Sequence, residues 1–132
     1  MKKFTVVTIV LAAMALLLAA CGGDSGPTAL SFEGSDTFQF TPSSASVTSG
    51  GEVEVTLNNT GALEHSWTLV NAGVDVATVT DADAIDGATT GTVAAGGTGN
   101  VTFTAPAAGS YQFVCTVAGH AAAGMVGTLT VN

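Results

Sequence analysis

The most informative part of the sequence runs from Tyr111 to Met125 and reads YQFVCTVAGHAAAGM. Tyr111, Phe113 and Cys115 occupy alternate positions in its first part, and His120 and Met125 follow Cys115 at intervals of five residues. Far upstream, His65 is the other of the chain's two histidines and opens the run HSWTLV. One thiolate, two imidazoles and one thioether form the ligand set of a copper electron-transfer site. The residue types therefore predict a metal centre built from His65, Cys115, His120 and Met125.

Strand parity places three of these ligands independently of their spacing. Alternate residues of a strand point to the same face of a sheet. Each ligand shares a face with apolar neighbours: His65 with Trp67 and Leu69, Cys115 with Tyr111 and Phe113, and Met125 with Leu129 and Val131. His120 falls in the loop between Cys115 and Met125, where glycines before His120 and Met125 permit a tight backbone. A sandwich would gather the four ligands at one end of its core.

These residues resemble the small blue copper proteins, or cupredoxins, and most nearly the auracyanin and azurin type. Members of that type also place four residues between the cysteine and the loop histidine. The resemblance extends over roughly residues 38–131. It implies an all-β Greek-key sandwich or barrel with one short helix or helical turn in the middle loop. It also implies one copper ion per chain, with His65, Cys115 and His120 in a trigonal plane and Met125 as a long axial ligand.

Three residues beside the ligands are expected to support the metal centre. Many relatives carry asparagine after the first histidine ligand, where it braces the cysteine loop, whereas this chain has the shorter Ser66. Thr116 keeps the residue that commonly follows the cysteine. Glu64 should point away from the core by parity, and the resemblance leaves open whether its carbonyl contacts the metal as a weak fifth ligand.

Ordinary core packing is the competing interpretation of the four ligand residues. A single buried histidine, methionine or cysteine often serves only to fill the interior of a protein. Here both histidines fall at the two positions that the metal-binding pattern requires. Zinc also accepts cysteine and histidine, but methionine is a poor zinc ligand. Copper is therefore the expected metal.

The N-terminal residues have the pattern of an export signal. Lys2 and Lys3 precede a short apolar run, and the sequence LAAC at residues 18–21 resembles a bacterial lipobox. We expect a lipoprotein signal peptide at residues 1–20, a lipidated Cys21 with a flexible tether at 21–30, and a cupredoxin domain at 31–132. The protein would then be exported and anchored to a membrane by Cys21. The alternative is an uncleaved membrane anchor, for which the apolar run is short.

The charge of the chain limits its partners. Lys2 and Lys3 are its only basic side chains, so residues 21–132 combine ten carboxylates with no cation, against a net charge of −8 for the full sequence. Nucleic-acid binding is excluded because nothing could neutralise the phosphates. The acidic surface suits redox partners with a basic docking patch, although acidic surfaces also simply keep exported proteins soluble.

The rest of the chain alternates between short strands and turns rich in glycine, asparagine and proline. Strands are expected at residues 37–41, 52–57, 65–70, 101–104, 111–115 and 125–131. A helical turn is expected at residues 80–87, and one weak edge strand within 89–98. The acidic residues at 80–87 do not match a calcium loop, because the positions of the oxygen ligands do not fit. This segment is therefore interpreted as a solvated loop.

Together these features predict a membrane-tethered carrier of single electrons between larger redox complexes, and not an enzyme. Oxidases and reductases with a second copper need further histidines, which this sequence does not contain. One alternative is a copper-binding or copper-delivery lipoprotein. Another is a metal-free structural β-sandwich, which would make the cysteine, histidine and methionine spacing a coincidence.

Overall fold

The computed structural model describes residues 26–132, which form eight strands and two short 3-10 turns. Residues 1–25, with the expected signal peptide and Cys21, lie outside the described residues. No helix among residues 26–132 has the length and apolar character needed to cross a membrane. The elements in chain order are β1 (Thr28–Ser35), β2 (Gln39–Thr41), β3 (Ser44–Val47), β4 (Glu52–Asn59), β5 (Thr68–Asn71), η1 (Asp81–Asp83), η2 (Ile85–Gly87), β6 (Thr98–Thr104), β7 (Gly109–Val114) and β8 (Val126–Val131).

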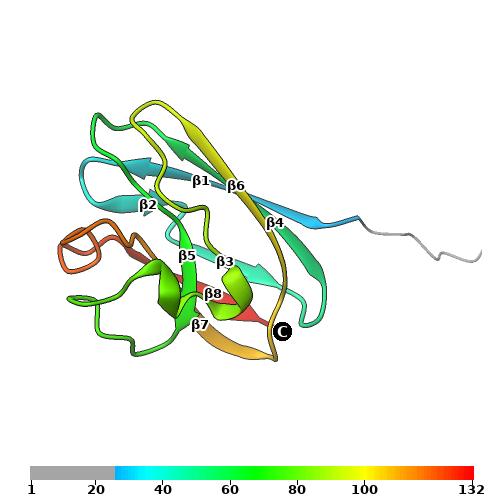
Figure 1. Cartoon of the computed structure of the whole chain (residues 1–132). Helices are drawn as coiled ribbons and strands as arrows, with labels where there is room; N and C mark the ends of the chain where they lie inside the picture. The colour runs from blue at the N-terminus through cyan, green and yellow to red at the C-terminus, as the bar shows by residue number, and fades with distance from the viewer. Residues whose placement is uncertain (1–25) are drawn as a thin grey trace, which may run out of the picture.

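The strands form two four-stranded sheets, ordered β2-β1-β4-β6 and β3-β8-β7-β5 (Figure 1). Most neighbours are antiparallel, but β1 runs parallel to β4 and β3 runs parallel to β8. Sequence-distant strands therefore lie side by side, as in a Greek-key sandwich. The predicted all-β sandwich is confirmed.

Alternation along β4 explains how one sheet covers the core. Val53, Val55 and Leu57 are fully buried, while Glu52 and Glu54 are exposed. This alternation of buried and exposed residues is typical of a sheet that has one face against the core and the other face in solvent. The predicted inward and outward faces of this segment are confirmed.

Trp67 lies fully buried in the core. Its ring stacks against Phe113 of β7 at a centroid distance of 5.6 Å, and against Phe32 and Phe103 at 5.8 and 5.9 Å. Its indole Nε1 has no hydrogen-bond partner among the described residues. Aromatic packing between the sheets thus outweighs the cost of one unpaired N–H, and it fixes the segment that begins with His65.

The middle segment matches one prediction and contradicts another. Thr80 caps η1 in a reciprocal arrangement with Asp83, and η2 ends at Gly87, so the expected helical turn is present. The expected edge strand at 89–98 is wrong, because only isolated bridges form there, at Thr89 and Val93. Left-handed glycines at positions 91 and 96 interrupt the extended backbone.

Other strand boundaries also differ from the sequence expectation. Phe38 has a φ of 56° and belongs to a turn, so β2 begins at Gln39. His65 bridges to Val93, and regular pairing of β5 with β7 starts only at Thr68. The sequence patterns did not reveal β1 and β3. Because β1 starts at Thr28, its first residues lie within the stretch that was expected to be tether.

Candidate metal centre

Three predicted ligands meet at one end of the sandwich. The Cys115 Sγ atom lies 3.5 Å from His120 Nδ1 and 4.0 Å from His65 Nδ1. These three potential ligand atoms all lie within 4.8 Å of one another. Cys115 and His65 are buried, while His120 is partly exposed.

These distances would allow one metal ion to bind all three ligand atoms. Metal–sulfur and metal–nitrogen bonds of about 2.3 and 2.0 Å, set about 120° apart, would place the two ligand atoms about 3.7 Å from each other. The two sulfur–nitrogen distances of 3.5 and 4.0 Å lie on either side of that value. A soft thiolate combined with two imidazoles suits copper. The donor set and its geometry therefore fit the predicted ion.

Met125 lies at the same end of the core and is fully buried. Its carbonyl accepts a hydrogen bond from the Cys115 N–H at 3.1 Å, which extends the pairing of β7 with β8 by one step. Its methyl group lies close to Gly34, since a Cβ at that position would be 3.2 Å from Met125 Cε and 3.5 Å from His65 Cβ. Because Gly34 has no side chain, both ligand side chains have space beside β1.

The loop between Cys115 and Met125 folds back on itself to bring His120 inward. The His120 carbonyl accepts from the Met125 N–H at 3.0 Å, and the His120 N–H donates to Val117 O at 3.0 Å. Gly119 and Gly124 have φ angles of 84° and 109°, which glycine adopts without steric cost. The predicted need for glycine before His120 and Met125 is confirmed.

Asp36 orients the first histidine, a role that the sequence did not suggest. The Nε2–H of His65 donates to Asp36 Oδ1 at 3.1 Å, which leaves Nδ1 facing the sulfur. The same carboxylate accepts from the backbone N–H groups of Ala62 and Leu63 at 2.7 and 3.1 Å. These two backbone hydrogen bonds are the main reason that the pKa of Asp36 is lowered. Outer partners of this kind fix the tautomer and orientation of a ligating histidine.

The buried Cys115 sulfur accepts a hydrogen bond from the main chain. The Ser66 N–H donates to Sγ at 3.3 Å. Burial raises the pKa of the Cys115 thiol, and hydrogen bonding from the Ser66 N–H partly opposes that rise. Ser66 Oγ accepts from Thr116 N–H at 2.8 Å, so the serine braces the cysteine loop despite being shorter than asparagine.

His120 lies where the metal centre reaches the surface. The ring of Phe38 packs against its imidazole at a centroid distance of 4.8 Å. Partial burial, followed by the effect of nearby His65, lowers the pKa of His120 and favours the neutral imidazole that a metal requires. In the loop around it, Ala118, Ala122 and Ala123 are exposed, whereas Ala121 is buried and not part of the expected surface patch.

Glu64 is exposed, as parity predicted. Its side chain takes part in none of the hydrogen bonds found among residues 26–132. The residues near the ligands that the sequence did not suggest are Gly34, Asp36 and Phe38. No sequence pattern marks Asp36 as a partner of a metal ligand, because His65 lies 29 residues further along the chain.

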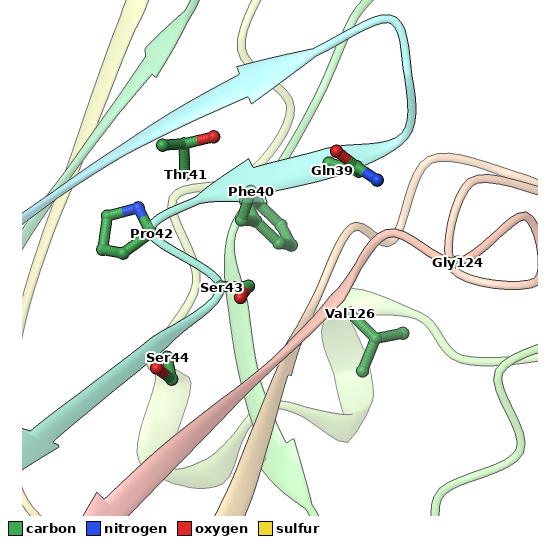
Figure 2. A pocket seen from close by; sticks show the side chains of 8 residues that line it. All are labelled: Gln39, Phe40, Thr41, Pro42, Ser43, Ser44, Gly124 and Val126. Atoms are coloured by element: carbon green, nitrogen blue, oxygen red, sulfur yellow. The ribbon is translucent and has the colours of Figure 1, made fainter.

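A hollow beside β2 is a different feature from the metal centre. It has a volume of about 560 Å³ and lies between the β2–β3 connection and the start of β8 (Figure 2). None of its lining residues is titratable or a metal ligand: Gln39, Phe40, Thr41, Pro42, Ser43, Ser44, Gly124 and Val126. Chemistry at the metal centre therefore does not involve this hollow.

Comparison with known proteins links this geometry to a family. The family described as copper binding proteins, plastocyanin/azurin family, matches residues 28–132. Auracyanin-A of Chloroflexus aurantiacus is 34% identical, over 96% of this chain and 95% of the relative. Auracyanin-B of the same organism is 41% identical over 59% of this chain, and the match spans 39% of its length. The copper-resistant cuproprotein CopI of Rubrivivax gelatinosus is 34% identical over 74% of this chain and 62% of its own.

Solved structures agree with these matches. Dithionite-reduced auracyanin from Roseiflexus castenholzii has a TM-score of 0.70 at 32% identity, covering 81% of this chain and 98% of that one. Auracyanin B has a TM-score of 0.72 at 30% identity, covering 83% and 91%. The predicted resemblance to the auracyanin type is confirmed.

The contact between Asp36 and His65 gives a test of the geometry. In Asp36→Ala, His65 loses the acceptor that orients its ring, so we expect copper affinity to fall by about 10- to 100-fold. Competition with a chelator measures this affinity. Glu64→Ala is the matched control, since Glu64 adjoins His65 without bonding to it, and its affinity should stay unchanged. Equal affinities for the two variants would contradict the role given to Asp36.

Proposed function

The chain belongs to the plastocyanin/azurin family of copper-binding proteins, and on that premise we propose that it carries single electrons on one copper ion. It is a blue copper protein of the auracyanin type. The observation that carries the proposal is the cluster of the Cys115 sulfur and two imidazole nitrogens within 4.8 Å. The residues proposed to hold the ion are His65, Cys115, His120 and Met125.

The surrounding protein suits rapid electron exchange. A bound copper ion would supply the one-electron couple. Burial of Cys115, His65 and Met125 excludes water from their side of the centre, and main-chain hydrogen bonds keep the ligands in place with or without an added electron. Among the four ligands only His120 reaches the surface, so its imidazole edge is the proposed point of electron entry and exit. A site of this kind carries electrons and needs no catalytic residue.

The visible spectrum tests this function. On addition of Cu(II), we expect an intense thiolate-to-copper absorption band that disappears with a mild reductant and returns on oxidation. Cys115→Ser should have no such band, because the sulfur supplies the electron density for the transition. A wild-type protein without the band, or a band that survives Cys115→Ser, would refute the assignment.

A copper-resistance or copper-delivery role is the second candidate, because one relative bears the name copper-resistant cuproprotein. The two roles differ in how firmly the ion is kept. A carrier retains copper through repeated reduction and oxidation, whereas a delivery protein releases it to an acceptor in one oxidation state. The buried ligand set favours retention, and the same redox cycling experiment, followed by copper analysis, decides between the two roles.

The proposed partners are redox proteins with a basic docking patch. Beyond residue 3 the chain has no lysine or arginine, and the carboxylates of Asp36, Glu64, Asp75 and Asp81 are exposed on the described surface. Such a surface attracts cationic partners over distances set by the Debye length.

Ionic strength therefore gives a second test. The rate of electron transfer to a small cationic oxidant should fall by about tenfold or more between low and high salt, since screening removes the attraction. Stopped-flow mixing measures the rate. An anionic oxidant is the control, and its rate should rise over the same range. Equal salt dependence for both oxidants would exclude steering by the acidic surface.

We further propose an extracytoplasmic position with a lipid anchor at Cys21. The support is the signal pattern before Cys21, together with similarity to auracyanin-A over 95% of that relative. Two acyl chains on one residue meet the requirement for stable membrane attachment. In membrane fractionation, Cys21→Ala should shift the protein from the membrane to the soluble fraction while leaving its visible spectrum intact. Retention of the variant at the membrane would point instead to an uncleaved anchor.

A further inference from the structure

Asp81 accepts hydrogen bonds from threonine hydroxyl groups on three separate segments of the chain. Its Oδ1 atom lies 2.6 Å from Thr116 Oγ1, 3.2 Å from Thr68 Oγ1 and 3.1 Å from Thr89 Oγ1. Thr116 directly follows the ligand Cys115, and Thr68 opens β5 three residues after His65. The expectation of a simple solvated loop at 80–87 does not account for these bonds.

A continuous set of polar contacts leads from Asp81 to the sulfur. Thr116 Oγ1 lies 2.8 Å from Ser66 Oγ, and Ser66 Oγ lies 3.8 Å from Cys115 Sγ. Ser66 Oγ also accepts the Thr116 N–H at 2.8 Å. Asp81 is thus two hydroxyl groups away from the atom proposed to bind copper.

The charge of Asp81 fixes the direction of these bonds. An ionised carboxylate can only accept, so the single hydroxyl hydrogen of Thr116 points to Asp81. The lone pairs of Thr116 Oγ1 are then free to accept from the Ser66 hydroxyl at 2.8 Å. That short bond is preferred over the 3.8 Å approach to the sulfur. The sulfur is left with the main-chain donor Ser66 N–H.

We propose that Asp81 is a positioning residue that directs the Thr116 and Ser66 hydroxyls away from Cys115 and so lowers the reduction potential of the copper ion. The inference rests on the proposed electron-carrier function. Hydrogen bonding around the cysteine sulfur tunes the potential of such centres. Two effects of Asp81 disfavour reduction of Cu(II) to Cu(I). The sulfur receives no hydrogen bond from the Ser66 hydroxyl, and the negative charge of Asp81 lies nearby.

Two substitutions at Asp81 separate its charge from its bonding. Asp81→Asn removes the charge but keeps an oxygen that accepts from Thr116, whereas Asp81→Ala removes both. Thr116→Val keeps the charge and breaks the chain of hydroxyls. Asp86→Asn is the matched control, because it removes one exposed carboxylate from the same segment, and that carboxylate takes part in no hydrogen bond among residues 26–132.

The measurement is a redox titration of the copper-loaded full chain, followed by the thiolate-to-copper band. We expect Asp81→Ala to shift the Cu(II)/Cu(I) equilibrium toward Cu(I) by about tenfold, which is about 59 mV for one electron. The shift in Asp81→Asn should be about threefold, and that in Thr116→Val should also favour Cu(I). Asp86→Asn should stay close to the wild type. The band position should move in Asp81→Ala and Thr116→Val, where the sulfur gains a donor, and not in Asp81→Asn.

Equal shifts for Asp81→Ala, Asp81→Asn and Asp86→Asn would overturn the proposal, because surface charge alone would then explain them. Unchanged potentials with lowered thermal stability would also overturn it and leave Asp81 a purely structural tie. If Asp81→Ala does not fold, Thr116→Val tests the proposal instead. An unchanged absorption band and reduction potential in Thr116→Val would contradict the role given to the Thr116 and Ser66 hydroxyls. A wild-type protein without the band refutes the electron-carrier function itself, which is a separate outcome.

Discussion

The hydrogen bond from the Cys115 N–H to the Met125 carbonyl, 3.1 Å long, closes the loop on which the metal centre depends. It continues the pairing of β7 with β8 beyond the last strand residues, so Cys115 and Met125 are neighbours before any metal is considered. Nine residues between them must then turn within a small space, which is why Gly119 and Gly124 take left-handed conformations. His120 is carried inward by that turn and meets the sulfur at 3.5 Å.

The other histidine reaches the centre by a different route. His65 exchanges two main-chain hydrogen bonds with Val93, and its ring is held by Asp36 from the β1–β2 turn. Buried Asn59 supports the same region by donating to the carbonyls of Leu63 and Val93 at 2.8 and 3.0 Å. The ligand from outside the β7–β8 hairpin is therefore fixed by main-chain bonds to Val93 together with a side-chain bond to Asp36, whereas the hairpin ligands are fixed mainly by backbone pairing.

Carboxylates have two roles in this acidic chain. Those among residues 26–132 lie exposed on the surface, where most make either no hydrogen bond or only a local one, as Asp83 does with Thr80. Asp36 and Asp81 also accept hydrogen bonds beside the ligand segments, and each joins elements that are far apart in the sequence. The sequence suggested no role for Asp36 and placed Asp81 in a solvated loop. Short polar contacts made across the fold leave no periodic pattern, so composition and spacing could not separate these two from the other carboxylates.

Local patterns in the sequence were enough to predict the ligand types, their spacing, the inward face of β4 and the all-β class, because each follows from periodicity or from a chemical preference of nearby residues. The sequence could not reveal β1 and β3, whose alternation is weak and whose parallel partners β4 and β8 are distant. It also placed a strand at 89–98, where glycines allow only isolated bridges. Only the tertiary structure decided which carboxylate meets which ligand, since such contacts depend on the packing of the two sheets.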